Sequence, residues 1–486
     1  MSNTGEIWKD NSPIPMDCDQ VQRAANFLVE KNLQSLSEGN RDLILFPENN
    51  QEFLKSKIFA WNYNSDGHSG IWTTNIMGVL NYKNEDVNVR ISVGSRFDVD
   101  SNKQPNPGQP FLVYLLSDVF EGYFLDCSVD AERNDLWEVL LVFLFTYHLE
   151  HSYSRGLFKQ YMHSEYNESC FKGSLDVGRH LKNNIPFVGR IAYNLEEFTH
   201  DNPILWLVRH AHNTLQSKYP RLLASVMNRR STVTEAIRVI FEATPSYSPQ
   251  RRYQLYTKCS APIRHPFFTQ YEGLRKTCLQ ILRRDEGLTP YSDDSEKVYG
   301  VLFDGAWLWE QFVAKRLAKI GLKHHIYGRP DDGILVFEGR ENYRFYPDFT
   351  RGTTVVLDAK YKPQRLNSEW NSADVHQILS YMFLTGADTG GVIYPAPAGT
   401  DSEIKEFSTG GGKGRWLQIP FGIPDCNDTF RTAMDARIQE WENNVFKCLG
   451  TAQNYRKVND GERTVAAIAG SKGKRITYRG TMSSPN

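Results

Sequence analysis

Two apolar runs joined by a short turn constrain the fold of this 486-residue chain more than any other feature. They lie in the segment YRFYPDFTRGTTVVLDAKYKP, residues 343–363, with the turn at residues 350–353. The pattern predicts two neighbouring strands of one sheet. Because helical and strand patterns alternate from residue 297 onward, we expect these strands to belong to an α/β core.

The same two strands carry polar residues with a chemical meaning. Side chains alternate between the faces of a strand, so Asp358 and Lys360 share one face, and strand pairing can bring Asp348 beside Asp358. Two carboxylates and an ammonium suit Mg²⁺, for which Mn²⁺ can substitute, because hard divalent cations take oxygen ligands. Such a metal activates water and polarises a phosphoryl oxygen, while Lys360 can orient or deprotonate the attacking water. The pattern therefore predicts phosphodiester hydrolysis.

Two predicted helices flank these strands. In the first, residues 302–320, Glu310 falls on the stripe that faces the core, where a carboxylate is costly unless it is paired or binds a metal. The second, residues 372–384, carries three polar side chains on one face: Asp374, Gln377 and Tyr381. That face can flank the substrate phosphate or the attacking water.

The predicted catalytic set has five members: Asp348, Asp358, Lys360, Glu310 and Gln377. Three of them are the predicted metal ligands: Asp348, Asp358 and Glu310. Simpler interpretations remain open, because Glu310 can form a buried salt bridge and Gln377 can serve to pack its helix against the sheet. Three histidines are expected in surface or packing positions: His324, His325 and His376.

The chain as a whole predicts an α+β multidomain protein. Alternating apolar residues at 87–93 indicate a partly β-rich N-terminal region, residues 1–125. Helical patterns dominate a middle region, residues 126–290, although residues 163–184 interrupt them. A polar, turn-rich stretch at 285–296 precedes the C-terminal α/β domain, residues 291–450. The remaining residues, 451–486, form a basic tail that we expect to be loosely ordered.

Charge and composition narrow the function further. A formal net charge of −1 excludes a uniformly basic nucleic-acid coat, so contacts with DNA have to come from local patches. Residues 249–284 contain eight basic residues and one acidic residue, with tyrosines and phenylalanines between them. This stretch can track a DNA backbone, or it can be a solvated helical face with an aromatic core. Lys413, in the glycine-rich segment 410–414, is followed by Gly rather than by the Ser or Thr of a nucleotide-binding loop, so we expect no nucleotide hydrolysis by this chain.

The expected location is the cytoplasm. The N-terminal residues lack the basic and apolar regions of a secretory signal, and the longest apolar run, residues 136–149, is too short to span a bilayer. We therefore expect that run to be a buried helix. The seven cysteines include no Cys-x-x-Cys pair, which favours reduced thiols over disulfides or a zinc site.

With these residues in view, the chain resembles the PD-(D/E)xK nuclease superfamily and, more narrowly, McrC, the nuclease subunit of McrBC-type modified-cytosine restriction systems. The resemblance covers roughly residues 70–445. Besides DAKYK and DVHQILSYM, the segments that carry it are GVLNYKNEDVNVRISV, SRGLFKQY, FKGSLDVGRHLKNN and YNLEEFTHDNPILWLVRHAHNTL.

The resemblance implies a C-terminal restriction-endonuclease-like domain in which Asp348, Asp358 and Lys360 match the family's nuclease residues, as do Glu310 and Gln377. It implies a partner, an McrB-like AAA+ GTPase ring, on which the N-terminal region docks and whose hydrolysis it stimulates. The expected function is Mg²⁺-dependent cleavage of double-stranded DNA in a restriction system that defends against phage. Two alternatives remain: a regulatory subunit with little nuclease activity that activates such a partner, and an autonomous nuclease.

Overall fold

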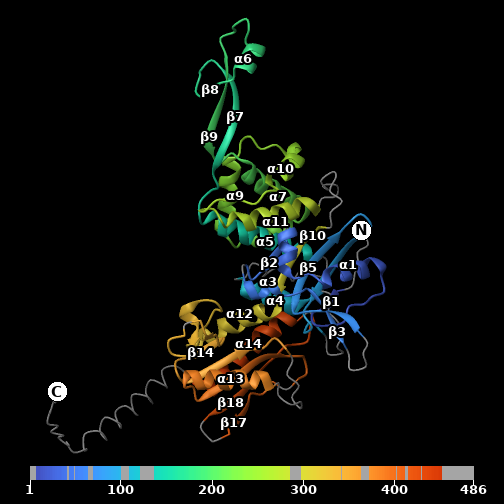
Figure 1. Cartoon of the computed structure of the whole chain (residues 1–486), viewed down its shortest axis with the longest axis vertical. Helices are drawn as coiled ribbons and strands as arrows, with labels where there is room; N and C mark the ends of the chain where they lie inside the picture. Colours follow the sequence, from blue (N-terminus) through green and yellow to red (C-terminus); the bar gives the residue numbers. More distant parts are fainter. Residues whose placement is uncertain are drawn as a thin grey trace, which may run out of the picture. The chain divides into compact units, whose positions relative to one another are not determined.

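The computed structural model describes residues 7–40, 43–48, 50–63, 69–99, 109–120, 136–284, 297–340, 342–362, 372–400, 402–410, 414–427 and 429–450. The chain divides into two compact units, and each is treated separately below. The first consists of residues 1–308 and 425–428, and the second of residues 309–424 and 429–486. The predicted linker at 285–296 and the basic tail lie outside the described residues. Figure 1 shows the order of the elements along the chain.

The first unit is built on a five-stranded sheet with the order β1-β6-β5-β10-β2. Its strands are β1 (Ile7–Lys9), β2 (Leu43–Phe46), β5 (Ile76–Lys83), β6 (Asn88–Gly94) and β10 (Lys297–Asp304). β5 and β6 form the antiparallel pair that the alternation at 87–93 predicts. β10 pairs antiparallel with β5 and parallel with β2, so a strand from the sequence range expected to start the C-terminal domain completes the N-terminal sheet.

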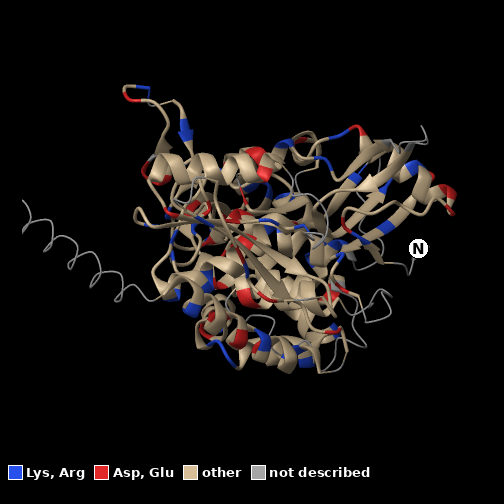
Figure 2. Cartoon of the chain, turned by 90° about the horizontal axis from the view of Figure 1, so that it is seen from below, with Lys and Arg blue, Asp and Glu red and all other residues tan. Residues whose placement is uncertain are grey.

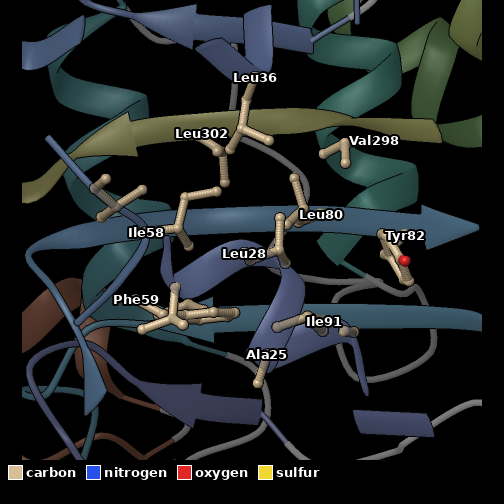
Figure 3. Close-up of a cluster of buried hydrophobic side chains, with 14 of the residues drawn as sticks. Ala25, Leu28, Leu36, Ile58, Phe59, Leu80, Tyr82, Ile91, Val298 and Leu302 are labelled. Carbon is tan, nitrogen blue, oxygen red and sulfur yellow. The ribbon is translucent and has the colours of Figure 1, made fainter. Parts of the chain in front are cut away.

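One face of this sheet is covered by the N-terminal elements. These are α1 (Asp19–Val29), α2 (Leu33–Gly39), α3 (Gln51–Lys55), β3 (Phe59–Tyr63) and β4 (Ser69–Thr73). Figure 3 shows Leu28 of α1 and Phe59 of β3 among the sheet residues Leu80 and Ile91, all of them buried. α1 and α2 are separate helices, because the side chain of Asn32 accepts a hydrogen bond from the amide of Ser35 and starts the second one.

The rest of the first unit is mainly helical, as the sequence predicts. Its helices are α4 (Pro110–Val119), α5 (Leu136–Tyr153), α7 (Pro203–Lys218), α8 (Pro220–Met227), α9 (Ser231–Ala243), α10 (Arg252–Cys259) and α11 (Tyr271–Arg284), with a short 3₁₀ turn at Pro249–Arg251. α5 contacts α8, α9 and α11, and its apolar residues from Trp137 to Phe145 are buried, which confirms the expected core helix. Among the described residues, no helix is both long and apolar enough to cross a membrane.

The interruption at 163–184 is a small sheet, which the sequence did not predict. β7 (Gln160–Glu168) and β9 (Ile191–Thr199) form a long antiparallel pair, joined by β8 (Ser174–Leu175) and the helix α6 (Val177–Asn183). Figure 1 shows this ribbon extending from the helices at its base. Burial alternates only between exposed and half-exposed residues along β7, so the strand has no apolar face for the sequence to reveal.

The second unit contains a six-stranded mixed sheet with the order β11-β14-β15-β16-β18-β17. Its strands are β11 (Lys323–His324), β14 (Phe349–Arg351), β15 (Val355–Ala359), β16 (Thr389–Ala396), β17 (Lys405–Ser408) and β18 (Arg415–Gly422). β14 and β15 are the predicted pair of strands, antiparallel and joined by a turn in which Gly352 has a positive φ of 56°. A separate short pair, β12 (Ile334–Leu335) and β13 (Arg344–Phe345), follows a 3₁₀ turn at Pro330–Asp332.

Helices cover both faces of this sheet. α13 (Ser372–Thr385) connects the parallel strands β15 and β16 and packs on one face through Ile378 and Met382. On the other face, Phe421 of β18 contacts Phe312 of α12 (Gly305–Leu317) and Trp441 of α14 (Phe430–Leu449). The helix expected over 302–320 thus begins later, because its first three residues end β10, and it closes with a 3₁₀ turn at Ala318–Ile320. The mixed α+β fold with several sheets is confirmed.

Candidate active site

The two aspartates of the predicted site lie side by side. In the β14–β15 pair, Phe349 lies opposite Leu357 and Thr350 opposite Val356, so the next step of this register places Asp348 opposite Asp358. Asp358 is 2% exposed, and its neighbour Val356 on the same strand face packs under α13. One carboxylate oxygen of Asp348 accepts a hydrogen bond of 2.6 Å from the amide of Ala359. Strand register therefore fixes both carboxylates on one face at the end of β15.

This arrangement is electrostatically unfavourable when both aspartates are ionised. Burial raises the pKa of Asp348 well above its usual value, and the charges of Asp358 and Glu310 raise it further. Burial also raises the pKa of Asp358, although Lys360 opposes that effect. Like charges disfavour one another's ionised form. A cation that enters the site would therefore stabilise the two ionised aspartates.

Lys360 supplies positive charge at this point. Its ammonium lies 2.6 Å from the Asp358 carboxylate and donates a hydrogen bond of 2.9 Å to the side-chain oxygen of Gln377. Burial by itself lowers the pKa of Lys360, but Asp358, Asp348 and Asp374 outweigh burial, and the net pKa is raised. Lys360 is therefore held in its charged, hydrogen-donating form.

Gln377 is placed by its helix to hold Lys360. Its amide nitrogen donates a hydrogen bond of 2.9 Å to the hydroxyl of Tyr381, one turn further along α13. That hydroxyl donates in turn to the backbone carbonyl of Tyr346, at 3.4 Å. The face-sharing predicted for Gln377 and Tyr381 is confirmed, and both are linked to the segment that leads into Asp348.

Asp374 begins the same helix face and lies further out. It forms an ion pair of 2.5 Å with Lys362, which follows Lys360 by two residues. Its charge raises the pKa of Asp358, so it lies within electrostatic range of the site. Neither Lys362 nor this pair was predicted, because the sequence does not show which basic residue α13 faces.

Glu310 faces the site from α12 and already has a partner. Its carboxylate accepts a hydrogen bond of 2.6 Å from the side-chain Nε2 of His324 on β11. Both side chains are partly exposed, at 28% for Glu310 and 20% for His324. We expected His324 in a surface or packing position and did not predict its contact with Glu310. No signal in the sequence pairs the two residues, since the register of β11 against β14 brings them together.

The donor groups suit a hard divalent cation in chemistry, and two of them suit it in position. Asp348 and Asp358 offer carboxylate oxygens that repel one another, which a divalent cation would relieve. Within the described part of the chain, however, no three histidine, cysteine, aspartate or glutamate side chains converge closely enough to hold a metal. Glu310 is hydrogen-bonded to His324, and its charge acts on both aspartates. Metal binding by all three carboxylates thus stays a prediction.

Three of the eight basic residues at 249–284 are used inside the fold, while Arg251, Lys258 and Arg264 are exposed. Arg275 is fully buried, forms an ion pair of 2.6 Å with Glu272 and donates to the carbonyl of Cys259. Arg283 donates to the hydroxyl of Tyr256, and Arg252 donates to the carbonyl of Leu282. These contacts favour the structural interpretation for the three arginines that make them. In Figure 2, basic and acidic residues are interspersed along the described chain.

The ribbon carries an unusual surface. Nine large apolar side chains are exposed on β7, β8, α6, β9 and the loops between them: Tyr161, Phe171, Leu175, Val177, Leu181, Ile185, Phe187, Val188 and Phe198. Exposed apolar groups gathered on one small element are typical of surfaces that bind a partner. We call these nine residues the ribbon patch.

Comparison with known proteins agrees with the sequence resemblance. A family model described as McrBC 5-methylcytosine restriction system component matches residues 71–395. None of the curated proteins compared with the chain matches it.

Five chains of solved structures match as well. One comes from the refined half-complex of a tetradecameric assembly of Thermococcus gammatolerans McrB AAA+ hexamers with bound McrC: 13% identity, a TM-score of 0.48, and coverage of 90% of this chain and 99% of the other. Another comes from the cryo-EM structure of the McrBC complex of the same organism: 14% identity, a TM-score of 0.31, and coverage of 66% and 89%. Since the family model spans about two thirds of the sequence, the chain belongs to the family of McrBC 5-methylcytosine restriction system components.

Proposed function

We propose that this chain is the nuclease subunit of a McrBC-like restriction system and that its second unit is a PD-(D/E)xK endonuclease domain cleaving double-stranded DNA. The observation that carries the proposal is the convergence of Asp348, Asp358 and Lys360 on one face of β14 and β15. Family membership supports it independently. We propose a cytoplasmic location, as such a system requires.

The chain's own residues would act on the reaction in distinct ways. Lys360, held charged by Asp358 and aimed by Gln377, would orient the attacking water and offset negative charge that develops on the phosphate. Its raised pKa favours this role over removal of a proton from water. Asp348 and Asp358 would hold Mg²⁺, and Glu310 would assist as a third carboxylate ligand. The bound ion would supply an activated water and polarise the phosphoryl oxygen.

We propose further that the chain works with a McrB-like AAA+ GTPase and stimulates its hydrolysis. Family membership supports the partner. The expected docking region was residues 1–125, but the described apolar residues of that range are largely buried in the sheet core. The ribbon patch is a better candidate for the contact because its apolar residues are exposed.

Plasmid cleavage tests the proposal. The purified chain is incubated with supercoiled plasmid, Mg²⁺, GTP and the McrB-like GTPase of the same genome, as wild type and as Asp358→Ala and Lys360→Ala. We expect that, of the three proteins, only the wild type cleaves the plasmid. All three should stimulate GTP hydrolysis by the partner to the normal extent.

The alternatives give other results. Cleavage that survives in both variants would refute the assignment of the active site. Stimulated GTP hydrolysis without cleavage by wild type would indicate a regulatory subunit, and efficient cleavage without the GTPase would indicate an autonomous nuclease.

A further inference from the structure

We propose that His324 is a positioning residue of the active site, which acts by holding Glu310 in place. The inference rests on the proposed function and adds to it a residue that no sequence motif marks. It starts from the hydrogen bond of 2.6 Å between His324 Nε2 and the Glu310 carboxylate. A carboxylate oxygen accepts hydrogen bonds, so His324 Nε2 is the donor.

His324 is itself held by the strand that leads from the catalytic aspartate. Its backbone pairs with Phe349, the residue after Asp348, in the β11–β14 ladder. Its ring lies against the ring of Phe349, with centroids 5.3 Å apart and planes tilted by 31°. Phe349 is fully buried. The imidazole therefore has little freedom, and its position relative to Asp348 is set by the sheet.

Glu310 needs such a support because its own helix leaves it partly exposed, at 28%. A glutamate at a helix surface has several rotamers, and fixing one of them costs conformational entropy. The charge of Glu310 nevertheless reaches both aspartates, since it raises the pKa of Asp348 and of Asp358. The bond from His324 thus determines where the third carboxylate stands relative to the pair that would bind metal.

The adjacent histidine provides a matched control. His325 lies on the same segment, but its ring nitrogens contact the hydroxyl of Thr350 at 2.6 Å and the carbonyl of Asp332 at 2.7 Å. Loss of the His325 ring removes two local hydrogen bonds without touching Glu310. A purely structural role for this segment therefore predicts similar effects at both histidines, whereas the positioning role predicts different ones.

The experiment measures metal binding without relying on turnover. The melting temperature of the full chain is recorded against Mn²⁺ or Mg²⁺ concentration for wild type, His324→Ala, His324→Gln and His325→Ala, and cleavage is then measured over the same concentrations. Loss of a group that orients a ligand typically weakens metal affinity about 10- to 100-fold. We expect a shift of that size in the half-saturating concentration for His324→Ala.

The two remaining variants should keep the wild-type metal dependence within about threefold. Gln retains a donor, and the His325 ring contacts Thr350 and Asp332 rather than a carboxylate of the site, while the backbone bond from His325 to the Asp348 carbonyl is kept in His325→Ala. An unshifted His324→Ala, a His324→Gln as poor as His324→Ala, or an equal shift in His325→Ala would overturn the inference while leaving the proposed function intact. A wild-type chain that gains no stability from either metal and cleaves no DNA would overturn both.

Discussion

Gln377 gives a quantitative test of how Lys360 is positioned. In Gln377→Leu the ammonium of Lys360 loses its 2.9 Å hydrogen bond to the amide oxygen, while its ion pair with Asp358 remains. A hydrogen bond to a charged group contributes about 1.5–3 kcal/mol. If that free energy serves to orient Lys360 in the transition state, cleavage should slow by roughly 10- to 150-fold.

Tyr381→Phe is the graded control for this change. It leaves the bond to Lys360 in place and removes the neutral bond from Gln377 to the Tyr381 hydroxyl, together with the long 3.4 Å bond from that hydroxyl to the Tyr346 carbonyl. A neutral bond contributes about 0.5–1.5 kcal/mol, so the rate should fall by roughly 2- to 12-fold. The assay is the initial rate of plasmid nicking and linearisation at saturating Mg²⁺, GTP and partner GTPase, with melting temperatures recorded in parallel. A Gln377→Leu protein that cleaves at more than half the wild-type rate would refute the reasoning, as would a Tyr381→Phe protein that is equally slow.

Three further predictions concern stability and docking. Asp348→Asn should raise the melting temperature at pH 7–8 in EDTA, by roughly 2–4 °C per kcal/mol of repulsion and burial cost that the change removes. The pKa of Asp348 is raised in the folded chain, so its ionisation lowers stability above the unfolded pKa, and the gain should shrink as the pH falls through the folded pKa. A gain that persists in acid would contradict this prediction. Arg275→Met should lower the free energy of unfolding by about 1.5–3 kcal/mol in denaturant titrations, since it removes the ion pair with Glu272 and the bond to the Cys259 carbonyl, whereas an effect confined to DNA affinity would favour the DNA-tracking interpretation. Phe187→Asp in the ribbon patch should reduce stimulation of the partner's GTP hydrolysis at least tenfold without changing the melting temperature. Arg190→Asp is the control, because Arg190 is exposed but not apolar. Equal effects of the two substitutions would argue against docking through apolar contacts.

The predictions from sequence succeeded where a pattern is local and one face of an element is buried. β5 with β6, the helix α5 and the β14–β15 pair all show their period in a short window, so their type could be read from the sequence. The ribbon was not predicted, because β7 and β9 bury no continuous face and lack apolar alternation. The place of β10 in the N-terminal sheet was not predicted for another reason. Its partners β2 and β5 lie more than 200 residues away in the sequence, and no local pattern specifies that pairing.

The active site follows the same rule. Asp348, Asp358 and Lys360 could be grouped from the sequence because one hairpin register fixes all three. Glu310 and His324 could not be paired, since their contact needs a helix and an edge strand to meet the same end of the sheet. The part of the site that we propose to bind a hard cation is therefore encoded locally. The part that orients the groups around it depends on tertiary structure, so substitutions there are the most informative about how the site is assembled.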